Sequence, residues 1–117
     1  MLGYKIFAAG LAGPLAAAML QDVVQNATAA GTNQATAYAI VNACVMFTTV
    51  ASGTGAILPS TAAPSDFVWI YNRGANALLV YPPVGAQILV GGTNIPFSIA
   101  AGTPALFMCF SATEWAA

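Results

Sequence analysis

The sequence has no histidine and very few charged residues. Charged side chains make up 4% of the 117 residues, whereas about 25% is usual in soluble domains. They are Lys5, Asp22, Asp66, Arg73 and Glu114. Two cations cannot neutralise several phosphates, and because that neutralisation dominates nucleic-acid binding, we expect no nucleic-acid partner. A net charge of −1 gives little repulsion between copies, so the composition favours association.

The absence of histidine removes the commonest general base, so one chain cannot assemble a Ser–His–Asp or Cys–His catalytic site. Asp66 and Glu114 both lie near predicted strand ends, where two carboxylates can face each other as in a glycosidase. The simpler interpretation is that Asp66 begins a strand after a turn and Glu114 keeps the C-terminal end hydrated. We therefore expect a protein that is not an enzyme and uses no cofactor, no metal and no small-molecule substrate.

Cysteine is scarce as well. Cys44 and Cys109 lie within apolar runs, NACVMFTTV and LFMCFS, and such cysteines usually act as small buried hydrophobes. Two cysteines without histidine fall short of the four ligands of a structural zinc site. A disulfide between the two predicted strands stays open, because sequence alone does not give the distance between them.

No apolar run is long enough to span a bilayer as a helix. The best candidate, IFAAGLAGPLAAAML from Ile6 to Leu20, falls short of the ~20 residues required. Lys5 followed by an apolar stretch and small residues also resembles a signal peptide. We expect no membrane partner, with a small membrane-associated or secreted protein as the alternative.

What the chain does contain is apolar residues, at 59% of the total. Its first part divides into MLGYKIF, predicted to be an extended arm, and a segment after Pro14. Leu15 to Asn26 is rich in Ala and Leu, with apolar residues at helical spacing, so we predict a short helix there. The predicted organisation is an arm with a short helix over residues 1–31 and a β-domain over residues 32–117.

The centre of the predicted β-domain is DFVWIYNRGANALLVYPPVGAQI, from Asp66 to Ile88. Phe67 to Tyr71 is an alternating run of aromatic and β-branched residues, which is typical of a strand. Asn72 to Asn76 supplies Asn and Gly for a reversal, and Ala77 to Tyr81 is a second run. We predict an antiparallel hairpin here. Because both of its faces are apolar, we expect both to be covered.

Further short apolar runs are separated by Gly- and Pro-containing turns. Ile95 to Ile99 is predicted to be an edge strand, because Pro96 lacks an N–H. Other strands are expected at Ala39–Val50, Ala56–Leu58, Gly85–Val90, Ala105–Ser111 and Ala112–Trp115. The predicted fold is all-β: a small antiparallel, jelly-roll-like β-sandwich or barrel. The turn-into-strand segments Ala51–Leu58 and Ala101–Phe107 are similar, but turn chemistry used twice explains this without a structural repeat.

Four segments together resemble a small β-domain of virion structural proteins in tailed bacteriophages. They are TNQATA (32–37), GTGAILP (53–59), VWIYNRGANALLVYPPVGAQI (68–88) and AAGTPALFMCFSATEW (100–115). The Asn72–Pro82 segment is the most specific of them, and residues 1–30 are outside the resemblance. Proteins of this kind are similar to head decoration, or cement, proteins, which sit as trimers on the capsid. Related β-domains occur in fibres and other appendages.

The resemblance implies a homotrimer that binds the major capsid protein on the outer surface of the phage head and stabilises the shell. A fibre or spike domain that binds a receptor or glycan is the alternative. Arg73 is expected either to contact a neighbouring subunit or, more simply, to be a solvated loop tip. The candidate interface residues are Tyr4, Ile6, Phe7, Leu15, Met19, Phe67, Trp69, Tyr71, Arg73 and Tyr81.

Overall fold

A computed structural model describes residues 22–117 of the chain, and these residues form ten strands in two sheets, with no helix among them. The six-stranded sheet has the spatial order β1 (Val23–Thr28), β3 (Cys44–Thr49), β5 (Phe67–Asn72), β9 (Pro104–Ser111), β10 (Glu114–Ala116) and β7 (Gln87–Ile88). The four-stranded sheet has the order β2 (Tyr38–Ala39), β4 (Gly55–Ile57), β6 (Leu78–Tyr81) and β8 (Phe97–Ile99). The all-β prediction is therefore confirmed.

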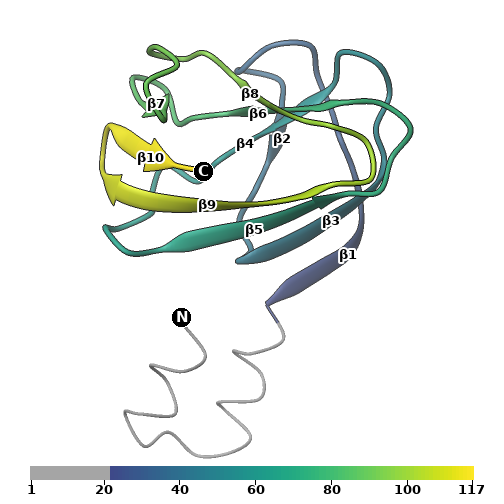
Figure 1. Ribbon diagram of the computed structural model, residues 1–117, viewed down its shortest axis with the longest axis horizontal. Coiled ribbons are helices and arrows are strands. Elements are labelled where there is room, and N and C mark those ends of the chain that lie inside the picture. Colours follow the sequence, from purple (N-terminus) through teal and green to yellow (C-terminus); the bar gives the residue numbers. More distant parts are fainter. Residues whose placement is uncertain (1–21) are drawn as a thin grey trace, which may run out of the picture.

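Successive strands alternate between the two sheets over the first part of the fold. The chain passes from β1 to β2, from β3 to β4 and from β5 to β6, and each step crosses from the six-stranded to the four-stranded sheet (Figure 1). The equivalent strands of successive crossings pair in parallel, β1 with β3 and β3 with β5, and likewise β2 with β4 and β4 with β6. We call the segment that connects the two strands of each crossing an arch. The stack of strand–arch–strand units resembles a β-solenoid, in which each unit buries its apolar face against its neighbours.

The predicted hairpin over Asp66–Ile88 is wrong. β5 and β6 are present where two strands were expected, but they belong to different sheets and do not pair. β5 pairs with β3 and β9, and β6 pairs with β4 and β8. The Asn- and Gly-containing reversal therefore turns the chain from one layer to the other, which a hairpin turn does not do.

The jelly-roll-like, antiparallel arrangement is also wrong, because both sheets are mixed. Among the ten named strands, the pairs β5 with β9, β9 with β10 and β6 with β8 are antiparallel and the other pairs are parallel. β8 and β9 thus form a further crossing that runs opposite to the first three and lies against the third. The prediction that the strand ending at Ile99 is an edge strand is confirmed, since β8 ends the four-stranded sheet.

The arm and helix predicted over residues 1–31 overlap the described part of the chain only from residue 22 onward. Val23 to Asn26, the end of the predicted helix, belongs to strand β1, so the helix is wrong there. The sheet accordingly starts at Val23 rather than at residue 32. The predicted arm and the earlier part of the helix lie outside the described residues. The strand region predicted over Ala39–Val50 contains β3 and the last residue of β2, and these two strands lie in different sheets.

The core lies between the two sheets and is filled by the inward-pointing half of each alternating strand. In β5, Val68, Ile70 and Asn72 are buried while their neighbours are more exposed. Two pairs of aromatic rings contact each other across the core in an edge-to-face arrangement. Tyr38 of β2 meets Phe47 of β3 at 5.2 Å between ring centroids, and Phe97 of β8 meets Phe107 of β9 at 5.5 Å. These contacts join the two layers at different levels of the stack.

Asn72 ties the arches together at the end of β5. Its side chain is fully buried, and its Nδ2 donates to the carbonyl oxygens of Asn76 at 2.9 Å and Ile99 at 3.0 Å. Its Oδ1 accepts from the Gly74 backbone N–H at 2.9 Å. In the same region Asn76 Nδ2 donates to the carbonyl of Val50 at 2.8 Å. The two asparagines thus link three neighbouring crossings through hydrogen bonds to backbone groups.

The two similar turn segments have the same local structure. Thr54 donates from its backbone N–H and its Oγ1 to the carbonyl of Ala51, at 3.1 and 2.7 Å, and Thr103 does the same to Ala100, at 3.2 and 2.6 Å. The glycine before each threonine has a φ near +80°, as the third residue of a type II turn requires. Both turns lie at crossings between the sheets, so the sequence similarity reflects one arch turn used twice.

Candidate functional site

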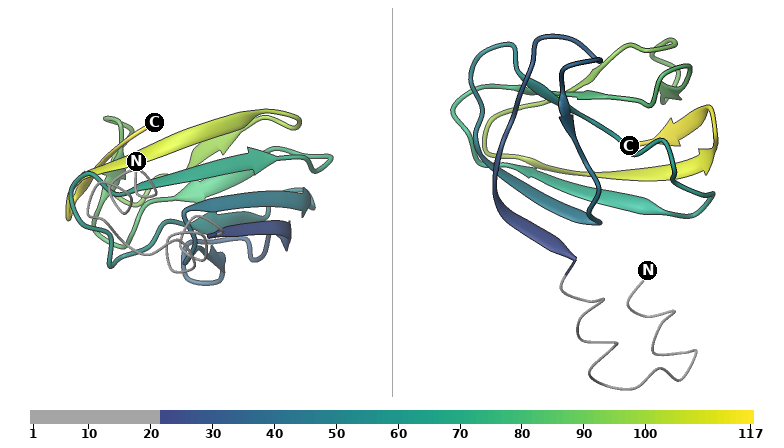
Figure 2. Two further views of the ribbon diagram at one scale, coloured as in Figure 1. Left: turned by 90° about the horizontal axis from the view of Figure 1, so that it is seen from below. Right: turned by 180° about the vertical axis from the view of Figure 1, so that it is seen from behind.

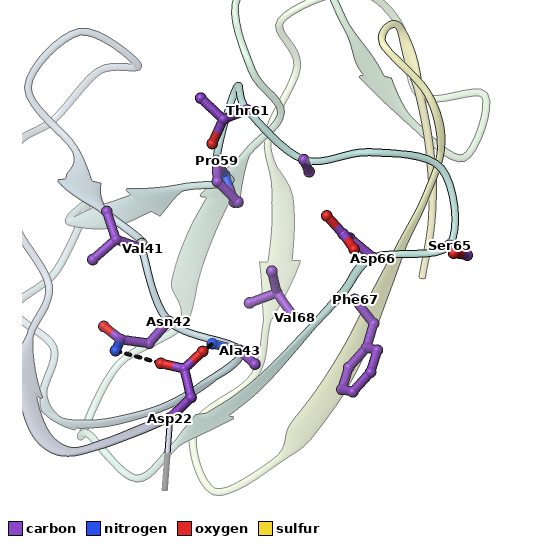
Figure 3. Close-up of a pocket in the computed structure, with 11 residues that line it drawn as sticks. Asp22, Val41, Asn42, Ala43, Pro59, Thr61, Ser65, Asp66, Phe67 and Val68 are labelled. Carbon is purple, nitrogen blue, oxygen red and sulfur yellow. Dashed lines mark hydrogen bonds between the residues drawn. The ribbon is translucent and has the colours of Figure 1, made fainter. Parts of the chain in front are cut away.

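One pocket of about 250 Å³ opens beside the start of β1, β3 and β5 (Figure 3). Its polar lining includes Asp22, Asn42 and Asp66, and apolar atoms come from residues such as Val41, Pro59 and Val68. Asp22 and Asp66 approach from opposite sides, whereas the ring of Phe67 points away from the hollow (Figure 3). Two of the described carboxylates border this pocket, so its chemistry is considered first.

Both carboxylate oxygens of Asp22 accept hydrogen bonds from neighbouring residues of the fold. Its Oδ1 accepts a hydrogen bond from Asn42 Nδ2 at 2.7 Å, and its Oδ2 accepts one from the Ala43 backbone N–H at 3.0 Å. Its carbonyl also accepts from the Cys44 N–H at 3.1 Å. Because both carboxylate oxygens hold the turn that leads into β3, Asp22 has a clear structural role at this position.

Asp66 has a similar local role at the start of β5. Its Oδ2 accepts from the Ala63 backbone N–H at 2.9 Å, and its own N–H donates to the Ala63 carbonyl at 3.0 Å. Glu114 is elsewhere, on β10, where its Oε2 accepts from Gln87 Nε2 at 2.8 Å. Asp66 and Glu114 line different pockets, so the structure does not bring the sequence-derived carboxylate pair together. Residues 22–117 also contain no cluster of three or more potential ligands placed to hold a metal ion.

Both cysteines carry free thiols. Cys109 is buried at the inner side of β9, and Cys44 is partly exposed on β3. Burial raises the pKa of the Cys44 thiol above its ordinary value of 9.0, and the charge of Asp22 raises it further. Burial also raises the pKa of the Cys109 thiol, with a smaller contribution from Asp66 and an opposing one from a hydrogen bond with Ser111. Raised pKa values disfavour the thiolate, so neither cysteine has the character of an activated nucleophile.

A larger feature is the outward-facing side of the six-stranded sheet, which we call the outer face. Strand register places Val23, Cys44, Trp69 and Leu106 in one row across four neighbouring strands. Adjacent rows place Met46 beside Tyr71 and Pro104, and Phe67 beside Met108. Trp69 is 46% exposed. Strands β3, β5 and β9 contain no charged residue, so the outer face is uncharged and mostly apolar across their width.

The outer face continues into a second hollow at the far end of the sheet. This hollow of about 330 Å³ is lined by Leu89, Val90, Phe110, Glu114, Trp115 and Ala116. Phe110 is 63% and Val90 91% exposed, although both are large and apolar. Leu89 has a φ of +54°, and its N–H donates to the Trp115 carbonyl at 2.7 Å. The hollow therefore adds exposed apolar surface to the end of the sheet that carries β9 and β10.

The structure groups some of the predicted interface residues and separates others. Phe67, Trp69 and Tyr71 lie together on the outer face, at alternate positions of β5. Arg73 is exposed at the crossing that follows β5, with its N–H bound to the Phe47 carbonyl at 2.8 Å. Tyr81 is buried, so its side chain offers no surface for a partner. Tyr4, Ile6, Phe7, Leu15 and Met19 lie outside the described residues.

Several outer-face residues were not among the predicted interface residues. Leu106, Met108 and Phe110 alternate along β9 with the buried Phe107 and Cys109. The alternation in ALFMCFS was a usable signal, but the sequence does not say which of the two alternating sets faces the core. Cys44 and Met46 on β3 carry the same ambiguity.

The described residues include no helix with the length and hydrophobicity needed to cross a membrane. The apolar segment Ile6–Leu20, on which the membrane alternative depends, lies outside them. A scan against protein-family models found no match, and searches of curated proteins and of solved structures found no significant match. The geometry and composition of the chain therefore carry the functional argument.

Proposed function

We propose that the protein is a structural protein of a tailed-bacteriophage virion: a capsid decoration protein that binds the outer head surface as a homotrimer and stabilises the shell. The observation that carries this proposal is the apolar outer face on a chain with 4% charged residues. A monomer rarely leaves a broad apolar face open to water, and such faces usually mark an interaction site.

The polar residues are consistent with a structural role. The described carboxylates, Asp22, Asp66 and Glu114, each accept a hydrogen bond that holds a turn or joins two strands. The buried asparagine at position 72 likewise joins crossings of the stack. A decoration protein acts through buried area and rigidity, so it needs no reacting groups. Contacts that bridge neighbouring capsid subunits then have to be broken before the shell expands, so a large enough interface opposes that expansion.

A map of the intact particle that carries this chain tests the proposal. The expected result is density for three copies on the outer surface of the head, together with loss of heat resistance in particles from which the protein has been removed. Density confined to the tail or fibres, or no density for the chain in the particle, would contradict the decoration role.

A glycan-binding fibre or spike domain is the second candidate, favoured by the exposed aromatic pair Trp69 and Tyr71. Their side chains lie at alternate positions of β5 and face the same side of the sheet. Flat aromatic rings with a polar edge suit contacts that are partly apolar and partly wet. Binding to a glycan array that is lost in Trp69→Ala but kept in Trp115→Phe, a change in the buried core, would favour this candidate.

A further inference from the structure

The exposed apolar side chains are distributed unevenly between the two sheets. Large apolar residues that are exposed within a strand of residues 22–117 all belong to the six-stranded sheet: Val23, Trp69, Tyr71, Leu106 and Phe110. The four-stranded sheet exposes Ala39 and Ser98 instead. Figures 1 and 2 show the two sheets as opposite layers, so the exposed apolar residues of the strands gather on one side of the molecule. One face, rather than the whole surface, needs a partner.

The area of the outer face is suited to a protein partner. Strands lie ~4.8 Å apart and rise ~3.3 Å per residue. A face of the four longer strands β1, β3, β5 and β9, each about six residues long, therefore measures roughly 400 Å² before side-chain relief is counted. In the proposed trimer three such faces turn toward one axis and bury ~1,200 Å² in total before relief and the adjoining hollow are counted, on the order of the ~1,000 Å² that a specific interface requires. A small ligand would leave most of this face exposed.

The charge of the chain favours a second copy as that partner. The central strands β3, β5 and β9 have no charged side chain, so the outer faces of sister copies meet in a trimer without placing like charges opposite each other. The net charge of −1 gives little long-range repulsion between identical chains. An acidic or basic partner would find no complementary charge on these strands.

We propose that copies of this chain associate through the outer face, with the row Val23, Cys44, Trp69 and Leu106 at the centre of the contact. This inference rests on the proposed homotrimer and deepens it by assigning the surface that faces the sister copies. The four-stranded sheet and the arches are then left on the outside of the assembly, where contacts with the shell are made.

The first test is the oligomeric state of Trp69→Glu, measured by size-exclusion chromatography with light scattering. A buried negative charge at the centre of the contact weakens association at least ~30-fold, as for a hot-spot residue, so the variant runs at the 11.8 kDa of one chain. Val84→Glu is the matched control, because Val84 is 78% exposed and lies in a turn away from the outer face. We expect Val84→Glu to have the same oligomeric mass by light scattering as the wild-type protein.

The second test uses the unmodified chain and does not depend on the folding of a variant. Trp115 is 1% exposed and Trp69 is 46% exposed in one copy, so acrylamide quenching of the oligomer reports whether Trp69 is covered. The expected result is quenching as weak as that of Trp69→Phe, in which Trp115 is the remaining tryptophan. Two results overturn this inference and leave the proposed function standing. One is a wild-type oligomer in which acrylamide readily quenches the emission of Trp69. The other is a Trp69→Glu variant that keeps the oligomeric mass of the wild type. A monomeric wild-type protein overturns both.

Discussion

Asn72 at the end of β5 donates a 3.0 Å hydrogen bond from its side-chain amide to the carbonyl oxygen of Ile99 at the end of β8. The two strands lie in different sheets and do not pair with each other. This bond therefore joins the two layers at the arches, where the ladders themselves make no connection. Among residues 22–117, Asn72 is the buried polar residue. Its side-chain amide also donates to the carbonyl of Asn76 and accepts from the N–H of Gly74.

We expect Asn72→Ala to destabilise the protein by roughly 3 kcal/mol. The substitution leaves the carbonyls of Asn76 and Ile99 and the N–H of Gly74 without their side-chain partner, and unsatisfied buried groups cost ~1–3 kcal/mol each. Urea unfolding followed by circular dichroism measures the change. Asn26→Ala, at an exposed position of β1, is the control and is expected to stay within ~0.5 kcal/mol of the wild type. Equal effects of the two substitutions would contradict the bridging role of Asn72.

Gly74 is expected to tolerate alanine poorly because of close packing between neighbouring arches. A Cβ at this position would lie 2.6 Å from the Cβ of Val50, so Gly74→Ala forces the two arches apart and costs roughly 2–3 kcal/mol. Gly85 provides the comparison, since it has a φ of +88° but nothing within 4 Å of an added Cβ. Gly85→Ala should cost only ~1 kcal/mol, through backbone strain. Thermal unfolding of both variants ranks the two effects, and a larger loss in Gly85→Ala would refute the packing argument.

The raised pKa of the Cys109 thiol predicts a loss of stability at alkaline pH. The folded-state pKa of Cys109 is raised above the ordinary 9.0 by burial, so the unfolded chain releases this proton first as the pH rises. The stabilisation is fully present below pH 9 and is lost as the pH increases through the folded-state pKa. Urea unfolding between pH 8 and pH 10 should show a smaller decline in Cys109→Ala than in the wild type. The Cys44 thiol is common to both proteins, so identical declines would contradict the prediction.

The positions of most strands could be predicted from local sequence, because period-two alternation and turn residues are local properties. Phe67–Tyr71, Ala77–Tyr81 and Ala105–Ser111 each overlap an observed strand within about a residue of its ends. Val23–Asn26 was assigned to a helix because Ala and Leu precede it, yet its valines pair with Cys44 and Val45 of β3. That pairing involves residues distant in the chain, and it outweighs the local preference.

The candidate site was predictable to a similar extent. Alternation identified Phe67, Trp69 and Tyr71 as one set, and they do share the outer face. The same rule placed Tyr81 at an interface, whereas the structure buries it. Both faces of these strands are apolar, so composition does not distinguish the core side from the open side. That distinction requires knowledge of where the second sheet lies.

By itself, the sequence determined that the region after residue 32 is built of strands, where most of its reversals fall, and that few charges are present to keep its surface solvated. The tertiary structure alone decided that the reversal after Asn72 carries the chain into the facing sheet, that the sheets contain parallel ladders, and that Trp69 lies outside while Trp115 lies inside. The physical reason is that alternation and turn chemistry act between neighbours in the chain, whereas strand partners and burial depend on contacts between distant residues.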